Sequence, residues 1–431
     1  MLLLEGIIKM TLNCRKIDSN GLVDFAVFAY IFSVFLADGT IVFDAAFVLL
    51  LFKDKKIVVN WFCILIALFI LFNFFMTFSG ITVFPAVSRR RLRSVLLNFI
   101  SDMIIFSYAK EQRNRQRIYK ISMCCAVVLI VYILLHNYQN LFSMRFGRKT
   151  PYLFGLRGTN GQYYNSNGVS YILNMAFAYC MLWLLKTKEQ GNDRIKTRRI
   201  IFIAFCIAFF TVLTGSRKGI LTLAVFLAVS SLLRNRSLEG KMKSILAIGG
   251  VVIIVYFLIM NVDALYNIVG KRMEVLINGV FSDEGFKTRT SAYYRARMIS
   301  IGIDLFKQRP LVGWGLDSFS QLSPYATYSH NNYIELLVSG GIIGFGLYYG
   351  ATVYVLLASG KFLKYREMRN ECIVLLSFAI TTLLFQVGHV VYVNRTSLLF
   401  DFIFASALID WNRRLRNRRA FGKFDNGSAG C

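Results

Sequence analysis

The chain has 431 residues, of which 56% are hydrophobic and only 17% charged, and its formal net charge is +27. This balance excludes an ordinary soluble globular protein, which would carry more charge and shorter apolar runs. The positive charge does not indicate nucleic-acid binding, because most Lys and Arg residues lie in short segments between apolar runs and no basic polar module is present.

The apolar runs predict an all-α, polytopic integral membrane protein that forms one membrane domain over residues 1–431. The N-terminal run is too short and too early for a cleavable signal, so the first span is expected to direct insertion. We predict about 12 transmembrane helices. They lie at 22–37, 41–52, 57–77, 94–108, 118–135, 167–186, 198–215, 218–233, 244–261, 332–358, 371–388 and 393–410. The second and fourth runs are short for a crossing helix, and whether they span the membrane stays open.

The Lys and Arg residues predict how these spans are oriented, because short loops rich in these residues stay on the cytoplasmic side. Loops of this kind lie at 110–120, 186–199, 234–243 and 361–369. Both termini are therefore expected in the cytoplasm, with residues 411–431 as a basic tail. The segment 262–331, between the ninth and tenth spans, becomes a large extracytoplasmic loop.

One basic segment, SRRRLR at 88–93, conflicts with this orientation because it lies on the outer side. Two interpretations stay open. The stretch 94–108 can be an amphipathic helix on the cytoplasmic surface. Alternatively, Arg89, Arg90 and Arg91 can form an outer cationic patch that binds an anion.

The outer segments hold the polar residues that could carry chemistry. His330 lies in YSHNNYIELL, where a polar loop meets the tenth span, with Ser329 as the expected N-cap of a helix that starts near Asn331. The positive end of that helix favours a neutral imidazole, which can accept a proton as a general base. The alternative is an interfacial histidine bonded only to loop backbone. His136 and His389 lie in less polar surroundings, and a structural role is favoured for both.

Two outer arginines could bind a phosphate group through both arms of the guanidinium. Arg217 follows the turn TGS with Lys218 beside it, and Arg157 lies in LRGTNGQYYNSN. For both arginines, contact with lipid headgroups is the alternative. Asp24 and Asp44 lie in apolar runs, where a proton relay is one interpretation and packing against a partner the commoner one.

The segment before His330 predicts local structure rather than chemistry. A helix is expected at about 291–307, and Gly313 and Gly315 in LVGWGLD allow a turn after it. Glycines of the tenth span are expected to allow close helix packing, namely Gly340, Gly341 and Gly344.

Other kinds of site leave no trace in the sequence. No Ser/His/Asp order, nucleotide-binding loop, Cys/His metal cluster or disulfide framework is visible, although the chain has eight cysteines. We therefore expect no metal or other cofactor, and a substrate that is itself activated and carried by a lipid.

Three motifs in this order along the chain resemble the O-antigen ligase/polymerase family, the Wzy-type polymerases and WaaL-type ligases of bacterial surface polysaccharide assembly. The first, LRGTNGQYYNSN, has Ser166 where proline is common. The second, TGSRKG, is similar to the family's Ser-Arg turn, and the third is RPLVGWGLDSF…HNNYIELLVSGGIIG. The likeness begins in the loop before the sixth span, and the chain before it shows nothing specific.

This resemblance implies metal-independent glycosyl transfer on the outer face of the bacterial inner membrane, from a glycan carried on undecaprenyl pyrophosphate. His330 would activate the acceptor hydroxyl, and Arg217 and Arg157 would hold the pyrophosphate and stabilise the leaving group. Supporting roles could fall to Lys218, Asn331, Arg89, Arg90 and Arg91. The implied partners are a lipid-linked glycan donor and acceptor, the lipid bilayer, a chain-length regulator and a flippase.

Two functions share these motifs. A repeat-unit polymerase, favoured because the family's polymerases are numerous, extends a glycan on its lipid carrier. An O-antigen ligase would transfer the finished glycan to lipid A core or to a protein. A flippase for lipid-linked oligosaccharides, or another transporter, is a function of a different class. It predicts inverted repeats and discontinuous helices, neither of which the sequence indicates.

Overall fold

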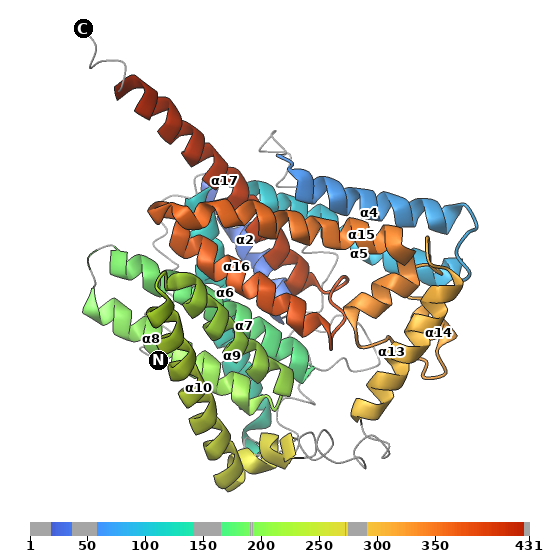
Figure 1. The fold of residues 1–431 in the computed structure, drawn as a ribbon, viewed down its shortest axis with the longest axis horizontal. Coiled ribbons are helices and arrows are strands. Elements are labelled where there is room, and N and C mark those ends of the chain that lie inside the picture. The colour runs from blue at the N-terminus through green and yellow to red at the C-terminus, as the bar shows by residue number, and fades with distance from the viewer. Residues whose placement is uncertain are drawn as a thin grey trace.

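The computed structural model describes residues 19–36, 58–140, 165–189, 191, 193–271, 273–274 and 291–425, which contain helices and no strand (Figure 1). The long helices are α2 (Ser19–Leu36), α4 (Trp61–Phe78), α5 (Pro85–Ala109), α6 (Gln112–Asn137), α7 (Ser166–Glu189), α8 (Arg194–Leu213), α9 (Arg217–Arg234), α10 (Leu238–Asn261), α13 (Ser291–Gln308), α15 (Asn332–Gly360), α16 (Arg366–Gln386) and α17 (Arg395–Asp425). The short ones are η1 (Tyr138–Asn140), α11 (Asp263–Leu265), η2 (Tyr266–Gly270), α14 (Phe319–Leu322) and η3 (Lys361–Lys364).

The predicted spans coincide with helices, except that 41–52 lies outside the described residues. In the described part of the chain, seven helices are long and apolar enough to cross a membrane: α4, α5, α6, α7, α10, α15 and α16. The predicted number of 12 spans is therefore not confirmed. The other helices have shorter apolar stretches, because basic residues occupy the first turn of α8 and both ends of α9, and two Asp residues interrupt α17.

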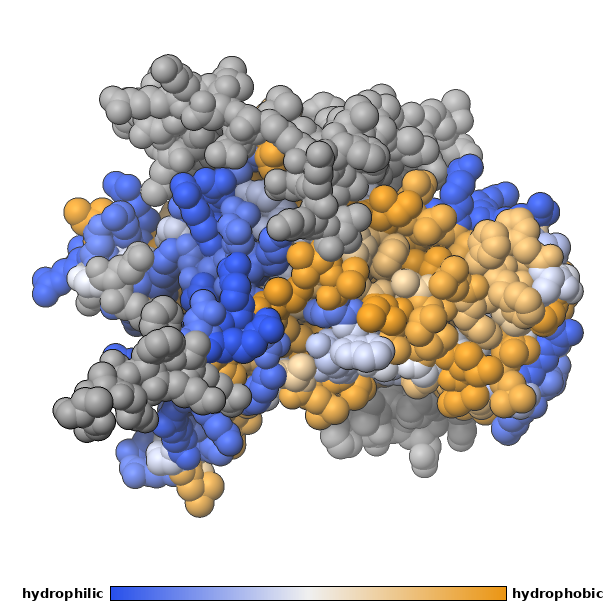
Figure 2. Space-filling model, turned by 90° about the horizontal axis from the view of Figure 1, so that it is seen from above, coloured by the Kyte–Doolittle hydropathy of each residue, from blue (hydrophilic) through white to orange (hydrophobic). Residues whose placement is uncertain are grey.

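The surface has the polarity expected of a protein surrounded by lipid. On the face shown in Figure 2, a broad hydrophobic area lies beside hydrophilic groups. In α10 only 6% of the most apolar window is buried, and Leu246, Ile254 and Phe257 are exposed. A soluble monomer rarely exposes such a continuous apolar surface. We expect α10 to lie against lipid.

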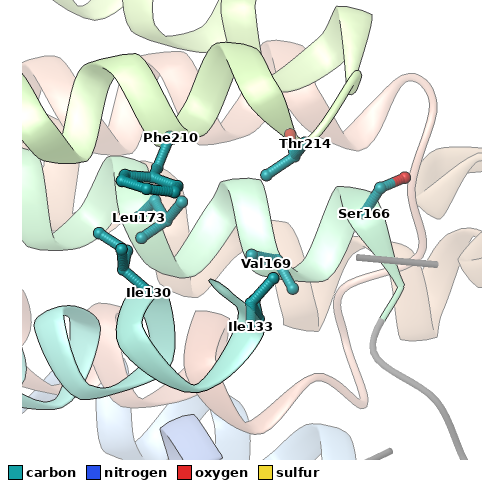
Figure 3. A pocket seen from close by; sticks show the side chains of 7 residues that line it. All are labelled: Ile130, Ile133, Ser166, Val169, Leu173, Phe210 and Thr214. Atoms are coloured by element: carbon teal, nitrogen blue, oxygen red, sulfur yellow. The ribbon is translucent and has the colours of Figure 1, made fainter. Parts of the chain in front are cut away.

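Packing between the helices is tight, with one small apolar gap between α6, α7 and α8 (Figure 3). Its volume is about 10 Å³, and Ile130, Leu173 and Phe210 point into it. Its walls carry no titratable side chain. It is a packing defect and not a candidate binding site.

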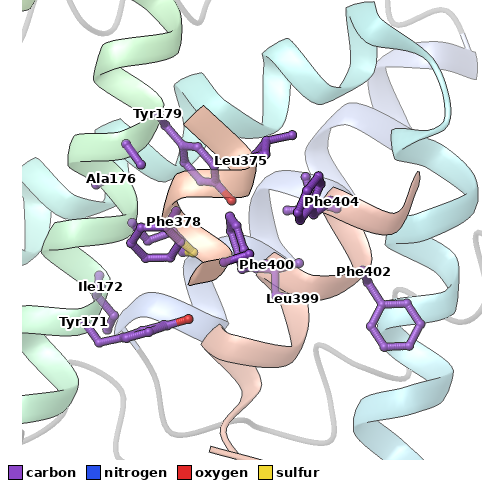
Figure 4. Packing of buried hydrophobic residues seen from close by; sticks show 14 of the residues in the cluster. Tyr171, Ile172, Ala176, Tyr179, Leu375, Phe378, Leu399, Phe400, Phe402 and Phe404 are labelled. Atoms are coloured by element: carbon purple, nitrogen blue, oxygen red, sulfur yellow. The ribbon is translucent and has the colours of Figure 1, made fainter. Parts of the chain in front are cut away.

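The main core lies where α7, α16 and α17 meet (Figure 4). The ring of Phe378 in α16 lies between those of Tyr171 in α7 and Phe400 in α17, with centroids 5.7 and 4.7 Å apart. Inclined aromatic pairs of this kind each add about 0.5–1.5 kcal/mol beyond the area they bury. Because α17 also packs along α5, the last helix connects the C-terminal part of the chain to its N-terminal third.

A buried ionic network connects α6, α16 and α17 at the end of α5 opposite to Arg91. Arg115 is fully buried and donates to both carboxylate oxygens of Glu371, at 3.0 and 3.1 Å, and to Asp410 at 2.8 Å. Tyr119 also donates to Glu371. Asp410 also pairs with Arg413 and Arg414, at 3.1 and 2.9 Å, so the network joins three arginines and two carboxylates.

Replacing Arg115 by methionine is expected to destabilise the fold by about 3–5 kcal/mol, because it removes the salt bridge to the carboxylate of Glu371, whereas Asp410 keeps Arg413 and Arg414. The measurement is the thermal unfolding midpoint of the purified protein in detergent. Arg113→Met removes an exposed arginine from the same turn of α6 and serves as the control. Equal midpoints for the two variants would contradict a stabilising role of the network.

Helix α15 is interrupted at Gly341, where φ is 59° and ψ −160°. The segment 310–315 fills the gap: two of its N–H groups donate to carbonyls before the break, and two of its carbonyls accept from N–H groups after it. These bonds run from Trp314 N to Val338 O (2.8 Å), from Gly315 N to Ser339 O (2.9 Å), from Ile342 N to Pro310 O (2.8 Å) and from Ile343 N to Leu311 O (3.2 Å). Four main-chain groups at the break thus find partners in this segment.

This break corrects two expectations from the sequence. A discontinuous helix is present, although the sequence indicated none. Gly341 serves the break instead of helix packing, since a Cβ there would lie 2.3 Å from the carbonyl oxygen of Leu311. Gly344 does pack closely on α4 as expected, with the ring of Phe72 3.3 Å from where its Cβ would be.

The helix predicted at 291–307 is present as α13, which packs against the first part of α15. Met298 and Leu305 form a small second core with Phe319 of α14 and with Ile334 and Val338 of α15. The loop that carries His330 therefore has its own apolar support beside the main bundle.

Two further candidates make structural contacts. Asp24 accepts hydrogen bonds from Arg117 at 2.6 Å and from Tyr108 at 2.8 Å, which fits packing against partners better than a proton relay. Asp44 lies outside the described residues. His136, in the last turn of α6, packs on the ring of Tyr132 at 4.7 Å.

Candidate active site

The loop that leads from α13 to α15 holds an unusual backbone. Asp317, Ala326 and His330 have φ values of 63°, 48° and 58°. In the described part of the chain, these are the residues other than glycine with positive φ. Such conformations are unfavourable for residues with a Cβ and are concentrated at functional sites. Packing around the loop must hold His330 in place.

The imidazole of His330 is half-buried, and its ring packs against that of Tyr328 with centroids 4.2 Å apart. Burial, and then the positive charges of Arg295 and Lys218, lower the pKa of His330 from 6.5 to about 4. The ring is therefore neutral at pH 7 and able to accept a proton. The neutral state agrees with the expectation from the sequence, but burial and two cations cause it.

The residues on either side of His330 fix its backbone. Asn331 is the N-cap of α15, since its side-chain oxygen accepts from Tyr333 N at 2.9 Å and Ile334 N at 3.2 Å. Ser329 was expected in that role and does not have it. Its hydroxyl donates to the carbonyl of Asn331, and its N–H donates to Oε2 of Glu335 at 2.8 Å. The helix starts at Asn332, one residue beyond the expected position.

The TGSRKG turn joins α8 to α9 and packs on the start of α7. Ser216 caps α9 by accepting from Gly219 N at 3.1 Å, and its hydroxyl donates to Asn167 of α7 at 2.8 Å. Asn174 donates to the carbonyl of Gly219 at 2.9 Å. A Cβ at Gly219 would lie 2.4 Å from Cβ of Ser170, so the two helices touch there. Residues of two sequence motifs are thus in contact.

Positive charge gathers beside the histidine. Arg217 begins α9, and the ammonium group of Lys218 is buried without a hydrogen-bond partner among the described residues. Arg295 of α13, together with Lys218, lowers the pKa of His330. A buried ammonium lacking a partner favours an anionic ligand. Arg157, the other expected pyrophosphate ligand, lies outside the described residues.

His389 belongs to this region, although its sequence context favoured a structural role. It lies between α16 and α17, next to Gly388, whose Cβ would come within 2.5 Å of the Lys218 ammonium. Burial, and then Lys218, His330 and Arg295, lower the pKa of His389 to about 4. In the sequence, His389 is marked only by its position near the predicted outer end of a span. His136 has the same kind of position, so the sequence alone does not distinguish the two histidines.

A polar pocket of about 390 Å³ opens beside these residues, between the end of α2, the start of α7, the loop before α15 and the connection from α16 to α17. Its polar lining consists of Arg91, Asn165, Asp317, Tyr328, Glu335, His389, Tyr392, Asn394, Arg395 and Thr396. The volume is within the range of small-molecule binding sites. His330 is not part of this lining, but its ring packs against Tyr328, which is.

The basic segment SRRRLR contributes one residue to this pocket. Arg91 forms a salt bridge of 2.7 Å with Asp317, and Ser88 donates to the carbonyl of Leu316 at 3.1 Å. Residues 88–93 therefore lie at the same end of the bundle as His330. This argues against a helix on the opposite surface, but Arg91 is paired with Asp317, so anion binding by the patch stays a prediction.

Some of the residues for which the sequence predicted supporting roles do not line the pocket. Arg89 and Arg90 are exposed and do not line it. Asn331 acts on the backbone as a cap, whereas Lys218 lies beside His330 and His389. Among the described residues, no three His, Cys, Asp or Glu side chains are placed to hold a metal ion.

Comparison with protein families agrees with this arrangement. Residues 200–349 match the O-antigen ligase family, and the match includes TGSRKG, α13, the loop with His330 and the broken part of α15. Arg91 and His389 lie outside it. A search of curated proteins finds no significant match. The chain thus carries an O-antigen ligase domain, which supports its membership of the O-antigen ligase/polymerase family.

Proposed function

We propose that this protein is a glycosyltransferase of the bacterial inner membrane, which transfers a glycan from undecaprenyl pyrophosphate to an acceptor hydroxyl. The observation that carries the proposal is a neutral histidine that feels the charge of a buried, unpartnered ammonium and packs on Tyr328, a residue that lines a polar pocket. The first can take a proton and the second can meet a phosphate. We further propose that both termini lie in the cytoplasm and that this pocket faces outward.

The reaction is a single displacement. The acceptor oxygen forms a bond to the anomeric carbon of the donor and gives its proton to the imidazole of His330. The bond between that carbon and the phosphate oxygen breaks, and its electron pair leaves with the diphosphate. Arg217 and Lys218, with Arg157, stabilise the charge that develops on this leaving group.

Donor binding and base strength are coupled in this scheme. Arg295 and Lys218 help to hold the pKa of His330 at about 4 in the free protein. An anionic pyrophosphate beside them offsets their charge and raises that pKa. The base therefore becomes stronger when the donor is in place.

We favour a repeat-unit polymerase over a ligase, and a deletion strain separates the two. Loss of a polymerase leaves single repeat units on the surface lipid. Loss of a ligase leaves long glycan on undecaprenyl pyrophosphate. Restoring the strain with the wild-type gene must return the normal length pattern. A strain whose surface glycan is unchanged by the deletion would contradict both functions.

The break in α15 gives a transporter some support, since discontinuous helices are common in transporters. However, the backbone of residues 310–315 fills the break, and Gly341 does not line the polar pocket. Purified protein in detergent distinguishes the two classes, because micelles have no two sides for transport. Transfer from the lipid-linked repeat unit in micelles is expected for an enzyme and excluded for a flippase.

Arg217→Lys is expected to lower kcat/KM by about 10- to 100-fold, because lysine keeps the charge but loses the paired hydrogen bonds of a guanidinium, each worth about 1.5–3 kcal/mol. The assay is transfer by the purified protein at varied donor concentration. Arg234→Lys, in the last turn of the same helix, is the control and should behave as wild type. Full activity of Arg217→Lys would show that a point charge is enough.

A further inference from the structure

Charge divides the surroundings of the pocket into two sides. The cations Lys218 and Arg295 act on His330 and His389. The carboxylates Asp317 and Glu335 line the pocket itself, together with Arg91 and Arg395, whereas Lys218 and Arg295 are not part of its lining. Tyr392 lines the pocket with the two carboxylates, and burial, and then Glu335, with a further contribution from Asp317, raise its pKa above the usual value.

Glu335 has an unused hydrogen-bond acceptor. The residue is 1% exposed and lines the pocket. Its Oε2 accepts from the N–H of Ser329, while its Oε1 is buried and has no partner among the described residues. A buried carboxylate oxygen without a partner is unfavourable. A ligand that donates a hydrogen bond would remove this penalty.

Asp317 is held in place beside it. Its Oδ2 pairs with Arg91 at 2.7 Å, and its backbone is fixed at a φ of 63°. Arg91 and Arg395 line the pocket together with the two carboxylates, so the lining carries both charges. The unpartnered Oε1 of Glu335 can accept a hydrogen bond from a sugar hydroxyl, whereas an ionised phosphate offers only acceptors.

The two sides meet at His330. Tyr328 packs on its ring and also lines the pocket, and the N–H that binds Glu335 belongs to Ser329, the residue just before it. A hydroxyl of a sugar bound by Glu335 is therefore near the base. A pyrophosphate beside Lys218 would approach the same base from the cationic side.

We propose that Glu335, Asp317 and Tyr392 form the acceptor-sugar subsite, in which Oε1 of Glu335 accepts a hydrogen bond from a hydroxyl group of the acceptor glycan. This inference rests on the proposed glycosyl transfer. It assigns acceptor recognition to the carboxylate side of the pocket and donor recognition to the cationic side.

The test uses the full-length protein in detergent with two substrates. The donor is the lipid-linked repeat unit that accumulates in the deletion strain. The acceptor is the free repeat-unit oligosaccharide, released from that lipid by mild acid, which has no diphosphate. Wild-type protein is expected to add a repeat unit to this free oligosaccharide. In Glu335→Gln, which keeps the acceptor for Ser329 N–H but replaces the other oxygen with a donor group, the KM for the oligosaccharide should rise about tenfold or more.

The KM for the lipid-linked donor should stay unchanged in Glu335→Gln, and Arg217→Lys should show the reverse pattern. Asp304→Asn removes an exposed carboxylate of α13 outside the pocket and is the control. Unfolding midpoints show whether each variant is folded, and Glu335→Asp replaces Glu335→Gln if the latter is not.

The outcomes are distinct. Free oligosaccharide that only inhibits, with a raised donor KM in Glu335→Gln, would assign this side of the pocket to the donor sugar and overturn the proposal. Unchanged constants in a folded Glu335→Gln would also overturn it. If wild-type protein transfers nothing even between two lipid-linked units, the proposed function itself fails.

Discussion

Replacing His330 by alanine is expected to reduce transfer by about 10²- to 10⁴-fold in kcat, the usual contribution of a general base. Donor binding should change little, because the cations beside His330 remain. The measurement is single-turnover transfer by purified protein, together with the length of the surface glycan in a complemented deletion strain. His136→Ala is the matched control, because His136 packs on Tyr132 at the end of α6 and does not line the pocket.

The protonation of His330 also predicts how the transfer activity depends on pH. The neutral imidazole is the active form, and the pKa of His330 in the free protein is about 4. Activity measured as kcat/KM should therefore be constant near neutral pH and fall as the pH drops through about 4. The fall in kcat should occur at a higher pH than the fall in kcat/KM, because the bound donor raises the pKa of His330. Normal long chains in His330→Ala, or a fall in both constants at the same pH, would contradict this role.

Replacing Gly341 by alanine is expected to prevent correct folding of the site. A Cβ there would lie 2.3 and 2.4 Å from the carbonyl oxygen and carbon of Leu311, which are backbone atoms and cannot rotate away. The residue would also be held at a φ of 59°, at a cost of about 1–3 kcal/mol before the clash is added. Loss of folded protein in detergent extracts, and loss of transfer, are the expected results.

Gly346→Ala is the control for this variant. Gly346 lies in the same helix, and a Cβ there meets nothing within 4 Å. Since glycine inside a helix is less favourable than alanine by about 0.5–1 kcal/mol, this change should be neutral or slightly stabilising. If Gly341→Ala matched Gly346→Ala in unfolding midpoint and activity, the break in α15 would not be needed.

Helix positions were largely predictable, because long apolar runs and the basic residues between them are local features. The position of His330 and the turn before Arg217 were predictable for the same reason. The N-cap was not, because Ser329 and Asn331 are both good capping residues and only the loop backbone decides between them. The number of membrane crossings also depends on more than hydropathy, since α8, α9 and α17 combine short apolar stretches with tight packing.

Contacts between distant segments could not be predicted from one sequence. The break at Gly341 depends on hydrogen bonds from residues 310–315, and neither segment alone indicates it. Arg91 meets Asp317 across more than half of the chain, and His389 joins Lys218 only through the fold. Arg91, Asp317 and His389 line the pocket, so its shape could not be predicted from the sequence, and the catalytic role of His330 stays a prediction.

The four main-chain bonds across the break in α15 close a ring of backbone that begins near Pro310, passes through His330 and returns at Ile343. Because side chains do not make these bonds, substitutions in the ring away from Gly313 and Gly341 leave its anchorage intact. In the proposed glycosyl transfer, the loop between these bonds can therefore vary with the sugar while the backbone of His330 stays anchored to the bundle.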